Sequence, residues 1–206
     1  MSVGKSVLIH SATESVGIAA IHIAQYVGAE VYATVDSPEK KDFLTSTFGL
    51  MDDHVLHSRN AGFCDQILSA TNSKGFDVIL LNSLAGDMFD ESFRVLADGG
   101  ALVELGKRDV LDRISLPMTP FNRNSTFKSV DLSTDNVSDI IVSRLMRKLF
   151  ELIEGGFIKP ISPVHKFPWT DVPAALRFLR LGTHVGKVVV SQDNPASGVQ
   201  VPVSFI

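Results

Sequence analysis

Short apolar runs alternate with helical repeats along the first 156 residues of the chain. Residues 6–10 form an apolar run, and from Val16 onward the apolar residues follow the spacing of one helix face. Residues 30–35 (EVYATV) predict a second buried strand. Ser37 and Pro38 then predict the cap and the first turn of a second helix. The chain therefore opens as strand, helix, strand, helix.

The same alternation continues further along the chain. In chain order, the pattern predicts strand 54–56, helix 62–70, strand 78–81, helix 87–96, strand 101–105, a surface loop at 108–123, strand 125–132 and helix 137–154. Strands that are apolar almost throughout are typical of a parallel sheet covered by helices on both faces. Because crossovers between parallel strands are right-handed, the predicted fold class is α/β, a doubly wound six-stranded parallel (Rossmann) sheet.

The pattern changes after residue 156. A short strand within 161–167, a helix over 172–181 and a strand over 186–191 predict a C-terminal strand–helix–strand tail. We expect domain boundaries at 1–156 and 157–191, followed by a linker over 192–206, which is rich in turn-forming residues. Two strands and one helix cannot bury a core by themselves, so the tail is expected to pack against another domain.

Composition and charge exclude several classes of protein. The chain has 206 residues, of which 45% are hydrophobic and 20% charged, as in ordinary globular domains. A net charge of −4 gives no long-range attraction to phosphate backbones, so nucleic-acid binding is not expected. No apolar run approaches the roughly 18 residues of a membrane helix, and the first residues are not a signal peptide. We expect no membrane association and a cytoplasmic location.

The metal-ligating residue types are sparse. Cys64 is the single cysteine, which excludes an internal disulfide framework and an all-thiolate zinc site within the chain. No pair among the six histidines has a convincing metal-ligand spacing, and His10 and His22 are interpreted as structural. The sequence therefore predicts no metal site.

The turn between the first strand and the first helix carries the strongest indication of a ligand site. In an open parallel sheet, ligands bind at the carboxyl ends of the strands, where the strand order reverses. The free amides and the dipole at a helix start suit a diphosphate group. The candidate cofactor-binding residues here are Ser11, Ala12, Thr13, Glu14, Ser15, Val16 and Gly17. Gly17 is the lone glycine among them, and it could instead serve only to let the helix pack closely on the sheet.

Several sequence blocks resemble the medium-chain dehydrogenase/reductase superfamily. The blocks are 6–10 (SVLIH), 19–35 (AAIHIAQYVGAEVYATV) and 37–41 (SPEKK). Further blocks are similar to the enoyl reductase domain of highly reducing, fungal-type polyketide synthases, which is related to the same domain of animal fatty acid synthase. These blocks are 77–84 (DVILLNSL), 103–109 (VELGKRD), 118–121 (MTPF), 130–132 (VDL) and 186–190 (GKVVV). The resemblance runs from about residue 4 to residue 191.

The resemblance implies an NADPH-dependent oxidoreductase. Its relatives deliver a hydride to the β-carbon of an α,β-unsaturated thioester carried on an acyl carrier protein. It also implies neighbouring synthase domains as partners, and a homodimer. The family's N-terminal substrate domain is expected before Gly4, and residues 157–191 resemble a remnant of that GroES-like domain. Without the rest of that domain, the chain is not expected to turn over substrate.

The resemblance also implies two catalytic residues. Lys107 matches the family lysine that follows the fifth strand and interacts with the substrate or supplies a proton. The acidic partner of the animal relatives falls near Ser133, which leaves Asp131 as the nearest carboxylate. A solvated loop cation remains the alternative interpretation of Lys107, and a turn carboxylate remains that of Asp131.

Three further candidates come from loops of the matching blocks. Asn82 and Ser83 match a loop that lines the cofactor cleft, with a strand-terminating turn as the alternative. Gly106 belongs to the same block as Lys107 and is included among the cofactor-binding residues.

The residues after the second strand give opposing indications about the cofactor. Lys40 matches the family cation for the adenosine 2′-phosphate, although a surface lysine is equally compatible with the spacing. Asp36, next to Ser37, follows Gly17 by about 20 residues, where an acidic group usually holds the ribose 2′-hydroxyl and favours NAD. Lys40 therefore favours NADPH and Asp36 favours NAD.

The turn departs from the family pattern at Glu14. The family turn ends Gly-Gly-Val-Gly, where this chain has Glu14-Ser15-Val16-Gly17. A carboxylate ~5 Å from a phosphate charge, at an effective dielectric of ~20, repels it by about 3 kcal/mol. If the Glu14 side chain turns out into solvent, this repulsion falls to roughly 1 kcal/mol. The helix dipole stabilises a bound anion by ~0.3–1 kcal/mol, and by ~2 kcal/mol at best. We therefore expect NADPH binding to be weakened roughly ten- to a few-hundred-fold, or lost.

Three functions follow from these observations. The first is the cofactor-binding part of a polyketide synthase enoyl reductase, favoured by Lys40, Asn82 and Lys107. The second is a degenerate, non-catalytic reductase domain with a structural role in the megasynthase, favoured by Glu14 and Asp36. The third is a free-standing relative of quinone reductases, disfavoured by the Gly-Lys-Arg-Asp block and the linker-like end.

Overall fold

The chain divides into two compact units. The computed structural model describes residues 3–57, 63–81, 87–105, 115–131 and 137–192. The first unit is Met1–Pro160 and the second is Ile161–Ile206. The linker expected over 192–206 lies outside the described residues from residue 193 onward.

The first unit alternates strands and helices, as the apolar pattern predicts. Its strands are β1 (Ser6–Ile9), β2 (Glu30–Val35), β3 (Val55–His57), β4 (Phe76–Leu81), β5 (Leu96–Glu104) and β6 (Thr126–Ser129). Its helices are α1 (Ser15–Tyr26), α2 (Pro38–Phe48), α3 (Phe63–Ala70), α4 (Asp87–Arg94) and α6 (Asp139–Glu154), with short 3₁₀ turns η1 (Asp52–His54) and η2 (Thr119–Arg123).

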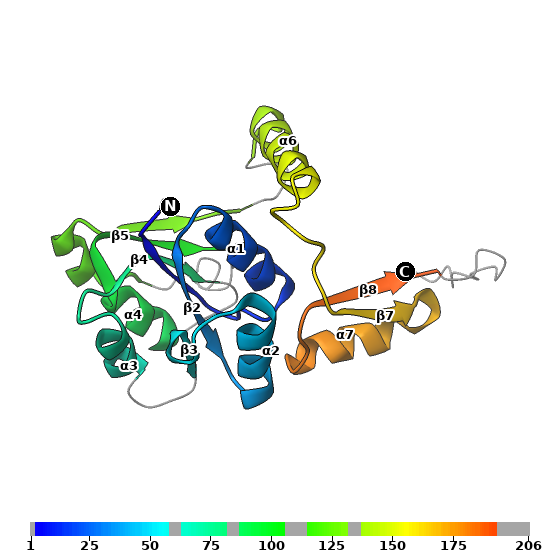
Figure 1. Cartoon of the computed structure of the whole chain (residues 1–206), viewed down its shortest axis with the longest axis horizontal. Helices are drawn as coiled ribbons and strands as arrows, with labels where there is room; N and C mark the ends of the chain where they lie inside the picture. Colours follow the sequence, from blue (N-terminus) through cyan, green and yellow to red (C-terminus); the bar gives the residue numbers. More distant parts are fainter. Residues whose placement is uncertain (1–2, 58–62, 82–86, 106–114, 132–136, 193–206) are drawn as a thin grey trace. The chain divides into compact units, whose positions relative to one another are not determined.

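The six strands form one parallel sheet in the order β3-β2-β1-β4-β5-β6 (Figure 1). The chain runs outward from β1 through β2 to β3, then returns to the other side of β1 and continues through β4 to β6. The strand order therefore reverses at β1, between β2 and β4. This arrangement confirms the predicted doubly wound Rossmann sheet.

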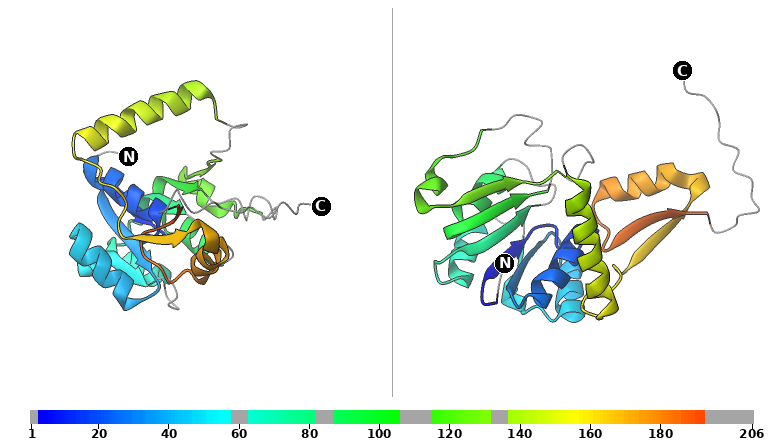
Figure 2. Two further views of the ribbon diagram at one scale, coloured as in Figure 1. Left: turned by 90° about the vertical axis from the view of Figure 1, so that its right-hand side faces the viewer. Right: turned by 90° about the horizontal axis from the view of Figure 1, so that it is seen from above.

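Alternate residues of the central strands enter two separate cores. On one face of the sheet, Val7 and Ile9 of β1 pack with Ile21 of α1 and Leu44 of α2. On the other face, Leu8 packs in a cluster that includes residues of α3 and α4. The views in Figures 1 and 2 show these helix pairs on either side of the strands. A strand buried on both faces reads as a continuous apolar run, which explains the sequence pattern.

The second helix begins at the predicted residues. The Ser37 hydroxyl accepts a hydrogen bond from the Lys40 amide, and Pro38 occupies the first turn, where its missing N–H costs nothing. Gly49 follows the helix in the left-handed conformation, with φ of 67°. Local side-chain chemistry therefore determines the limits of α2.

The region from α4 to β5 differs from the prediction. The helix predicted over 87–96 ends at Arg94, and β5 begins at Leu96 rather than at residue 101. Phe76 of β4 pairs with Leu96, whereas Val78 pairs with Ala101, so the register shifts between these pairs. The Asp-Gly-Gly sequence at 98–100 is thus accommodated as an irregularity of β5, although its residues are typical of a turn.

Two other predicted elements differ in extent. The strand predicted over 125–132 is ordered as β6 over four residues, and residues from 132 to 136 lie outside the described part of the chain. The loop predicted over 108–123 contains the 3₁₀ turn η2 at its end, and its residues 108–114 are also outside the described part.

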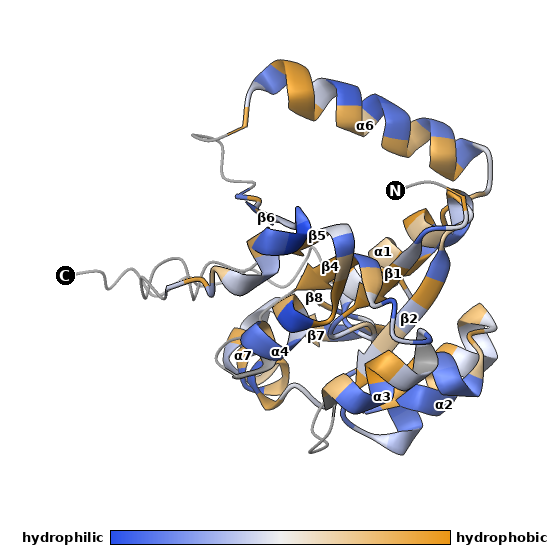
Figure 3. Cartoon of the chain, turned by 90° about the vertical axis from the view of Figure 1, so that its left-hand side faces the viewer, coloured by the Kyte–Doolittle hydropathy of each residue, from blue (hydrophilic) through white to orange (hydrophobic). Residues whose placement is uncertain are grey.

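Helix α6 buries few of its apolar side chains. Leu152 is buried, whereas Ile141, Leu145 and Phe150 are exposed. Figure 3 shows apolar and polar residues alternating along this helix. Its C-terminal end is held by an edge-to-face contact between Phe157 and Tyr26 of α1, whose ring centres are 4.9 Å apart.

The second unit is the predicted strand–helix–strand tail (Figure 2). It consists of β7 (Val164–Pro168), the 3₁₀ turn η3 (Trp169–Asp171), α7 (Val172–Leu181) and β8 (Lys187–Ser191), and the two strands pair in parallel. The Asp171 carboxylate caps α7 by accepting from the Ala174 amide. Trp169 and Leu176 are exposed, so the described part of this unit has a small core.

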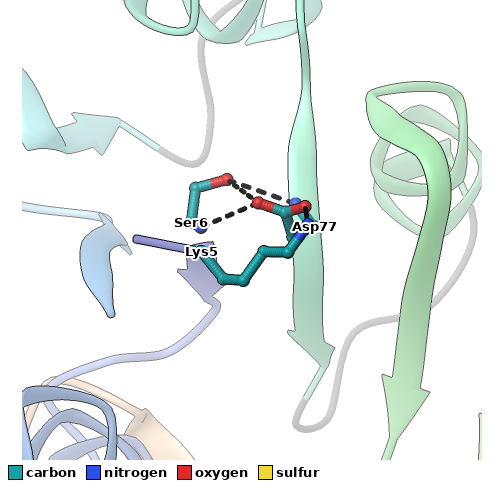
Figure 4. A network of polar contacts seen from close by, with 3 residues as sticks. All are labelled: Lys5, Ser6 and Asp77. Atoms are coloured by element: carbon teal, nitrogen blue, oxygen red, sulfur yellow. Dashed lines mark hydrogen bonds and ion pairs between the residues drawn. The ribbon is translucent and has the colours of Figure 1, made fainter. Parts of the chain in front are cut away.

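An ion-paired aspartate joins β1 to β4 at the amino edge of the sheet (Figure 4). The Lys5 ammonium lies 2.6 Å from one Asp77 oxygen, and the Ser6 amide donates to the other at 2.9 Å. Burial by itself would raise the pKa of Asp77, but the hydrogen bonds from Lys5 and Ser6 and the Lys5 charge outweigh it and lower this pKa. The ionised carboxylate therefore stabilises the folded state.

Replacing Asp77 with asparagine is expected to lower the free energy of unfolding at pH 7 by about 1–3 kcal/mol, because charge-assisted hydrogen bonds are lost. A carboxyl whose pKa is lowered by folding stabilises above its unfolded pKa of about 4, and this stabilisation disappears at lower pH. The difference between wild type and Asp77→Asn, measured by urea unfolding, should thus shrink below pH 4. The exposed Asp42→Asn change is the matched control, and an equal loss there would contradict the prediction.

Candidate functional site

The β1–α1 corner, defined as residues 10–17, lies at the carboxyl end of the strand where the sheet order reverses. Strand β1 ends at Ile9, and α1 begins at Ser15. The Ala12 amide donates to the Thr34 carbonyl of β2 at 3.5 Å, which holds the turn against the neighbouring strand. The corner therefore occupies the position at which open parallel sheets bind their ligands.

The backbone of the corner is tightly folded. Ser11 has a φ of 49°, in the left-handed region that residues other than glycine seldom adopt. The Glu14 amide donates to the Ser11 carbonyl at 3.1 Å, which closes the turn. Ala12 and Thr13 are buried beneath it. The corner is a fixed element rather than an open loop.

Gly17 allows α1 to approach this turn. A β-carbon at this position would lie 2.5 Å from both the Ala12 α-carbon and the Ser11 carbonyl oxygen, which is closer than such atoms come in proteins. Any other residue would push the start of α1 away from the corner. Gly17 therefore has the close-packing role of a glycine in a dinucleotide-binding turn.

The first turn of α1 keeps its positive end available. Glu14 is the N-cap residue in an extended conformation, and its side chain makes no capping hydrogen bond. The first turn contains no acidic residue. The amides at the helix start and the helix dipole can therefore act on an anion, as at other helix N-termini that bind phosphates.

An ion pair lies next to the corner, where β2 passes into α2. The Lys40 ammonium is 2.8 Å from an Asp36 oxygen, and its side chain is only 9% exposed. Asp36 follows the last residue of β2, and Lys40 lies in the first turn of α2. The structure thus brings together the two residues that gave opposing indications about the cofactor.

Glu14 lies close enough to this ion pair for both of its charges to act on the carboxyl group. Its side chain is half-buried, and burial raises its pKa, which the Lys40 charge lowers and the Asp36 charge raises. We call these three residues the Glu14–Asp36–Lys40 cluster. When all three are ionised, the cluster carries two negative charges and one positive charge, so it is a poor partner for a further anion.

A buried histidine supports the corner from beneath. His10 is fully buried, its Nδ1 lies 3.1 Å from the Thr34 hydroxyl, and its Nε2 lies 3.0 Å from the Ser92 hydroxyl of α4. Burial lowers the pKa of His10 to about 3, so its ring is neutral at physiological pH. The apolar pattern predicts His10 at the strand end, but its two hydroxyl partners come from distant segments that no local pattern connects.

The other candidate residues lie apart from the corner or outside the described residues. Asn82, Ser83, Gly106 and Lys107 fall in segments outside the described part of the chain. Asp131 is half-buried and follows β6, the edge strand, which is three strand positions from β1. At a strand spacing of about 4.8 Å, this places it roughly 14 Å from the corner.

Away from the corner, the described residues form a cleft but no metal cluster. The cleft, of about 380 Å³, opens at the amino edge of the sheet beside Tyr32 and Asp77, opposite the corner. Across 3–57, 63–81, 87–105, 115–131 and 137–192, no three histidine, cysteine, aspartate or glutamate side chains are grouped to hold a metal ion. Within the same ranges, no helix has the length and apolar character needed to cross a bilayer.

Comparison with known proteins identifies relatives over most of the chain. Residues 51–190 match the family model of zinc-binding dehydrogenases. A highly reducing polyketide synthase of Eupenicillium brefeldianum is 47% identical over 193 residues, which are 93% of this chain and 8% of the relative. The chain thus spans less than a tenth of the length of the first curated relatives that it matches.

Solved structures are similar over both described units. The CurK enoyl reductase is 35% identical with a TM-score of 0.80, over 93% of this chain and 56% of that chain. The nucleotide-binding subdomain of the enoylreductase domain of PpsC from Mycobacterium tuberculosis is 36% identical with a TM-score of 0.68, over 77% and 87% of the two chains. CurA from Vibrio vulnificus, solved with NADPH, is 21% identical with a TM-score of 0.76, over 95% of this chain and 59% of that chain. At this identity, the similarity shows the fold alone.

Proposed function

Because this chain belongs to the enoyl reductase domains of polyketide synthases, within the zinc-binding dehydrogenase family, we propose that it is the nicotinamide-dinucleotide-binding part of such a reductase. The single observation that carries the proposal is the β1–α1 corner, which lies at the reversal of the strand order with the start of α1 packed against it through Gly17. This geometry fits the diphosphate of a dinucleotide.

The proposed reaction is reduction of an α,β-unsaturated acyl thioester carried on an acyl carrier protein. When bound, the reduced nicotinamide supplies the hydride that adds to the β-carbon, and a proton must then reach the α-carbon. We assign to Lys107 the supply of that proton or the orientation of the substrate, and to Asp131 a supporting role. The family resemblance implies NADPH as the hydride donor.

The corner residues would hold the cofactor in this scheme. The amides of Ser15, Val16 and Gly17 open α1 and would donate to the diphosphate, and Ser11 to Thr13 would form the floor beneath it. Asp36 and Ser37 lie where the adenosine ribose binds in related folds. The resemblance assigns Asn82 and Ser83 to a loop that lines the cofactor cleft, and Gly106 is included with them among the cofactor-binding residues.

The second unit is proposed to be the remnant of a GroES-like substrate domain. Its described residues include exposed apolar side chains such as Trp169 and Leu176, which a larger domain would cover. Neighbouring synthase domains, the acyl carrier protein and a second copy of the chain are the proposed partners.

A second candidate function is a degenerate reductase domain that no longer binds the dinucleotide and serves a structural role in the synthase. The observation that favours it is Glu14, which places a half-buried carboxylate at the corner beside Asp36. Repulsion of up to about 3 kcal/mol would exceed the attraction of the helix dipole, ~0.3–1 kcal/mol.

Calorimetric titration of NADPH and NADH into the 206-residue chain separates the two functions. Micromolar binding that improves little in a Glu14→Gly variant would exclude the degenerate function. Undetectable binding that returns when Glu14→Gly is combined with Ser15→Gly would support it, because the family turn is then restored. The Asp42→Asn variant is the control for the change in net charge.

Dinucleotide affinity is expected to increase as the pH falls. Burial raises the pKa of Glu14, so acidification neutralises this carboxylate and removes its repulsion of the diphosphate. Titrations between pH 5 and pH 8 should show tighter binding at the lower pH. In Glu14→Gln the affinity should be higher at pH 8 and nearly independent of pH. If the affinity of Glu14→Gln depends on pH as strongly as that of wild type, a group other than Glu14 causes the pH dependence.

A further inference from the structure

The position for the adenosine ribose in this chain holds an ion pair in place of an available cation. Lys40 is the only positive charge of the cluster, and its ammonium contacts Asp36 at 2.8 Å with the side chain almost fully buried. Separating this pair would leave two charges poorly solvated, which is costly. Lys40 is therefore held by Asp36 and is restricted in its ability to turn toward a ligand phosphate.

Asp36 is placed to accept hydrogen bonds from a ribose. It follows β2 directly, β2 pairs with β1, and the Ala12 amide of the corner donates to the Thr34 carbonyl two residues before it. Its side chain is 29% exposed, so the carboxylate that contacts Lys40 is also accessible from solvent. A carboxylate at this position accepts from a ribose 2′-hydroxyl and repels a 2′-phosphate.

Glu14 adds a second negative charge on the corner side of Lys40. The Lys40 ammonium contacts Asp36, and its charge also acts on Glu14, so one positive charge offsets two carboxylates. A 2′-phosphate would bring up to two more negative charges to a cluster whose own net charge is −1. A free 2′-hydroxyl brings none.

Resting on the proposed function, we infer that the Glu14–Asp36–Lys40 cluster makes this domain selective for NADH over NADPH, the reverse of the preference that the family resemblance implies. Asp36 is the specificity-determining residue, because it binds the ribose hydroxyl and holds Lys40. Lys40 contributes by neutralising Asp36 rather than by binding a phosphate.

The test is calorimetric titration of NADH and NADPH, in parallel, into the full 206-residue chain and its variants. Wild type should bind NADH at least tenfold more tightly than NADPH. In Asp36→Asn the Lys40 ammonium is released, so NADPH should bind at least tenfold more tightly than in wild type, while NADH should bind equally or more weakly. Asp42→Asn removes the same charge from the exposed face of α2 and should leave the ratio of the two dissociation constants unchanged.

A double-mutant cycle shows whether Asp36 acts through Lys40. Lys40→Met in the wild-type background should weaken NADPH binding further, because Asp36 and Glu14 lose their counter-ion, whereas in the Asp36→Asn background it should abolish the gain. Thermal unfolding of each variant checks that the fold is retained. If Lys40→Met alone unfolds the chain, the double variant Asp36→Asn, Lys40→Met is used instead, because it removes both charges of the ion pair together.

The outcomes separate the inference from the proposed function on which it rests. If wild type binds NADPH more tightly, or if Asp36→Asn leaves the ratio of the constants unchanged, the inferred selectivity is wrong and the reductase function stands. If neither dinucleotide binds wild type, Asp36→Asn or the Glu14→Gly, Ser15→Gly variant, the proposed function is wrong, and the inference falls with it.

Discussion

Replacing Gly17 with alanine should lower the free energy of unfolding by about 2–3 kcal/mol, in the range expected for overpacking. Alanine is favoured over glycine within a helix by about 1 kcal/mol, so the change would stabilise α1 if space were available. Space is not available, because the new β-carbon would lie 2.5 Å from the Ala12 α-carbon and the Ser11 carbonyl oxygen. The neighbouring atoms are backbone and cannot rotate away.

The same substitution should weaken dinucleotide binding at least tenfold. Relief of the clash moves the start of α1 away from the corner, and its amides then no longer converge on one anion. Urea unfolding and calorimetric titration measure the two effects. Ser15→Ala, which adds no atom to the same turn, is the control for stability. A Gly17→Ala variant as stable as wild type would show that the corner is less tightly packed than the structure indicates.

Protonation of His10 is expected to dominate the acid sensitivity of the first unit. Burial lowers the pKa of His10 to about 3 in the folded protein, whereas the unfolded chain takes up this proton at about pH 6.5. Stability is therefore complete above pH 6.5 and falls by about 1.4 kcal/mol per pH unit below it, because the unfolded state binds more protons. At pH 4.5 the loss relative to pH 7 should be about 2–3 kcal/mol.

The variant His10→Leu should remove most of this slope. At pH 7 it should be less stable by about 1–3 kcal/mol, since the hydroxyls of Thr34 and Ser92 lose their bonds to the ring. Urea unfolding at pH 4.5, 5.5, 6.5 and 7.5 stays above the range in which Asp77 titrates. His22 also has a pKa lowered by burial, but it is half-buried, so His22→Leu should keep the larger part of the slope. If the free energy of unfolding of His10→Leu falls with decreasing pH as steeply as that of wild type, His10 is not the source of the acid sensitivity.

The two substitutions act on one element from opposite sides. Gly17 positions the helix against the corner, and His10 ties the strand end to β2 and α4. In the proposed function, binding of a dinucleotide at the corner requires both supports. Loss of binding in either variant therefore measures the rigidity of the site rather than a contact with the cofactor.

The fold could be predicted because each of its signals is local. Apolar runs such as 30–35 and helix signals such as Ser37 with Pro38 and Gly49 depend on neighbouring residues alone. The prediction was wrong where local and long-range effects compete. Asp98-Gly99-Gly100 reads as a turn, but pairing with β4 carries β5 through it.

The candidate site could be predicted only in part. The sequence places residues 11–17 and Asp36 at strand ends, which in a parallel sheet meet at one edge. It did not predict the ion pair that holds Lys40 or the burial of Glu14, because these depend on how α2 folds back beside the corner. It likewise did not predict the hydroxyl partners of His10, one of which lies 82 residues away.

The sequence by itself determined the order of the strands and helices and the family of the chain, and it predicted the position of a candidate phosphate-binding turn, since periodicity, caps and matching blocks depend on residues that are close together along the chain. The tertiary structure alone decided how the charges at that turn combine. Coulomb interactions depend on separation in space and on solvent exposure, and neither can be read from spacing along a sequence. Lys40 matched a phosphate ligand in the sequence, and in the folded chain it is the counter-ion of Asp36.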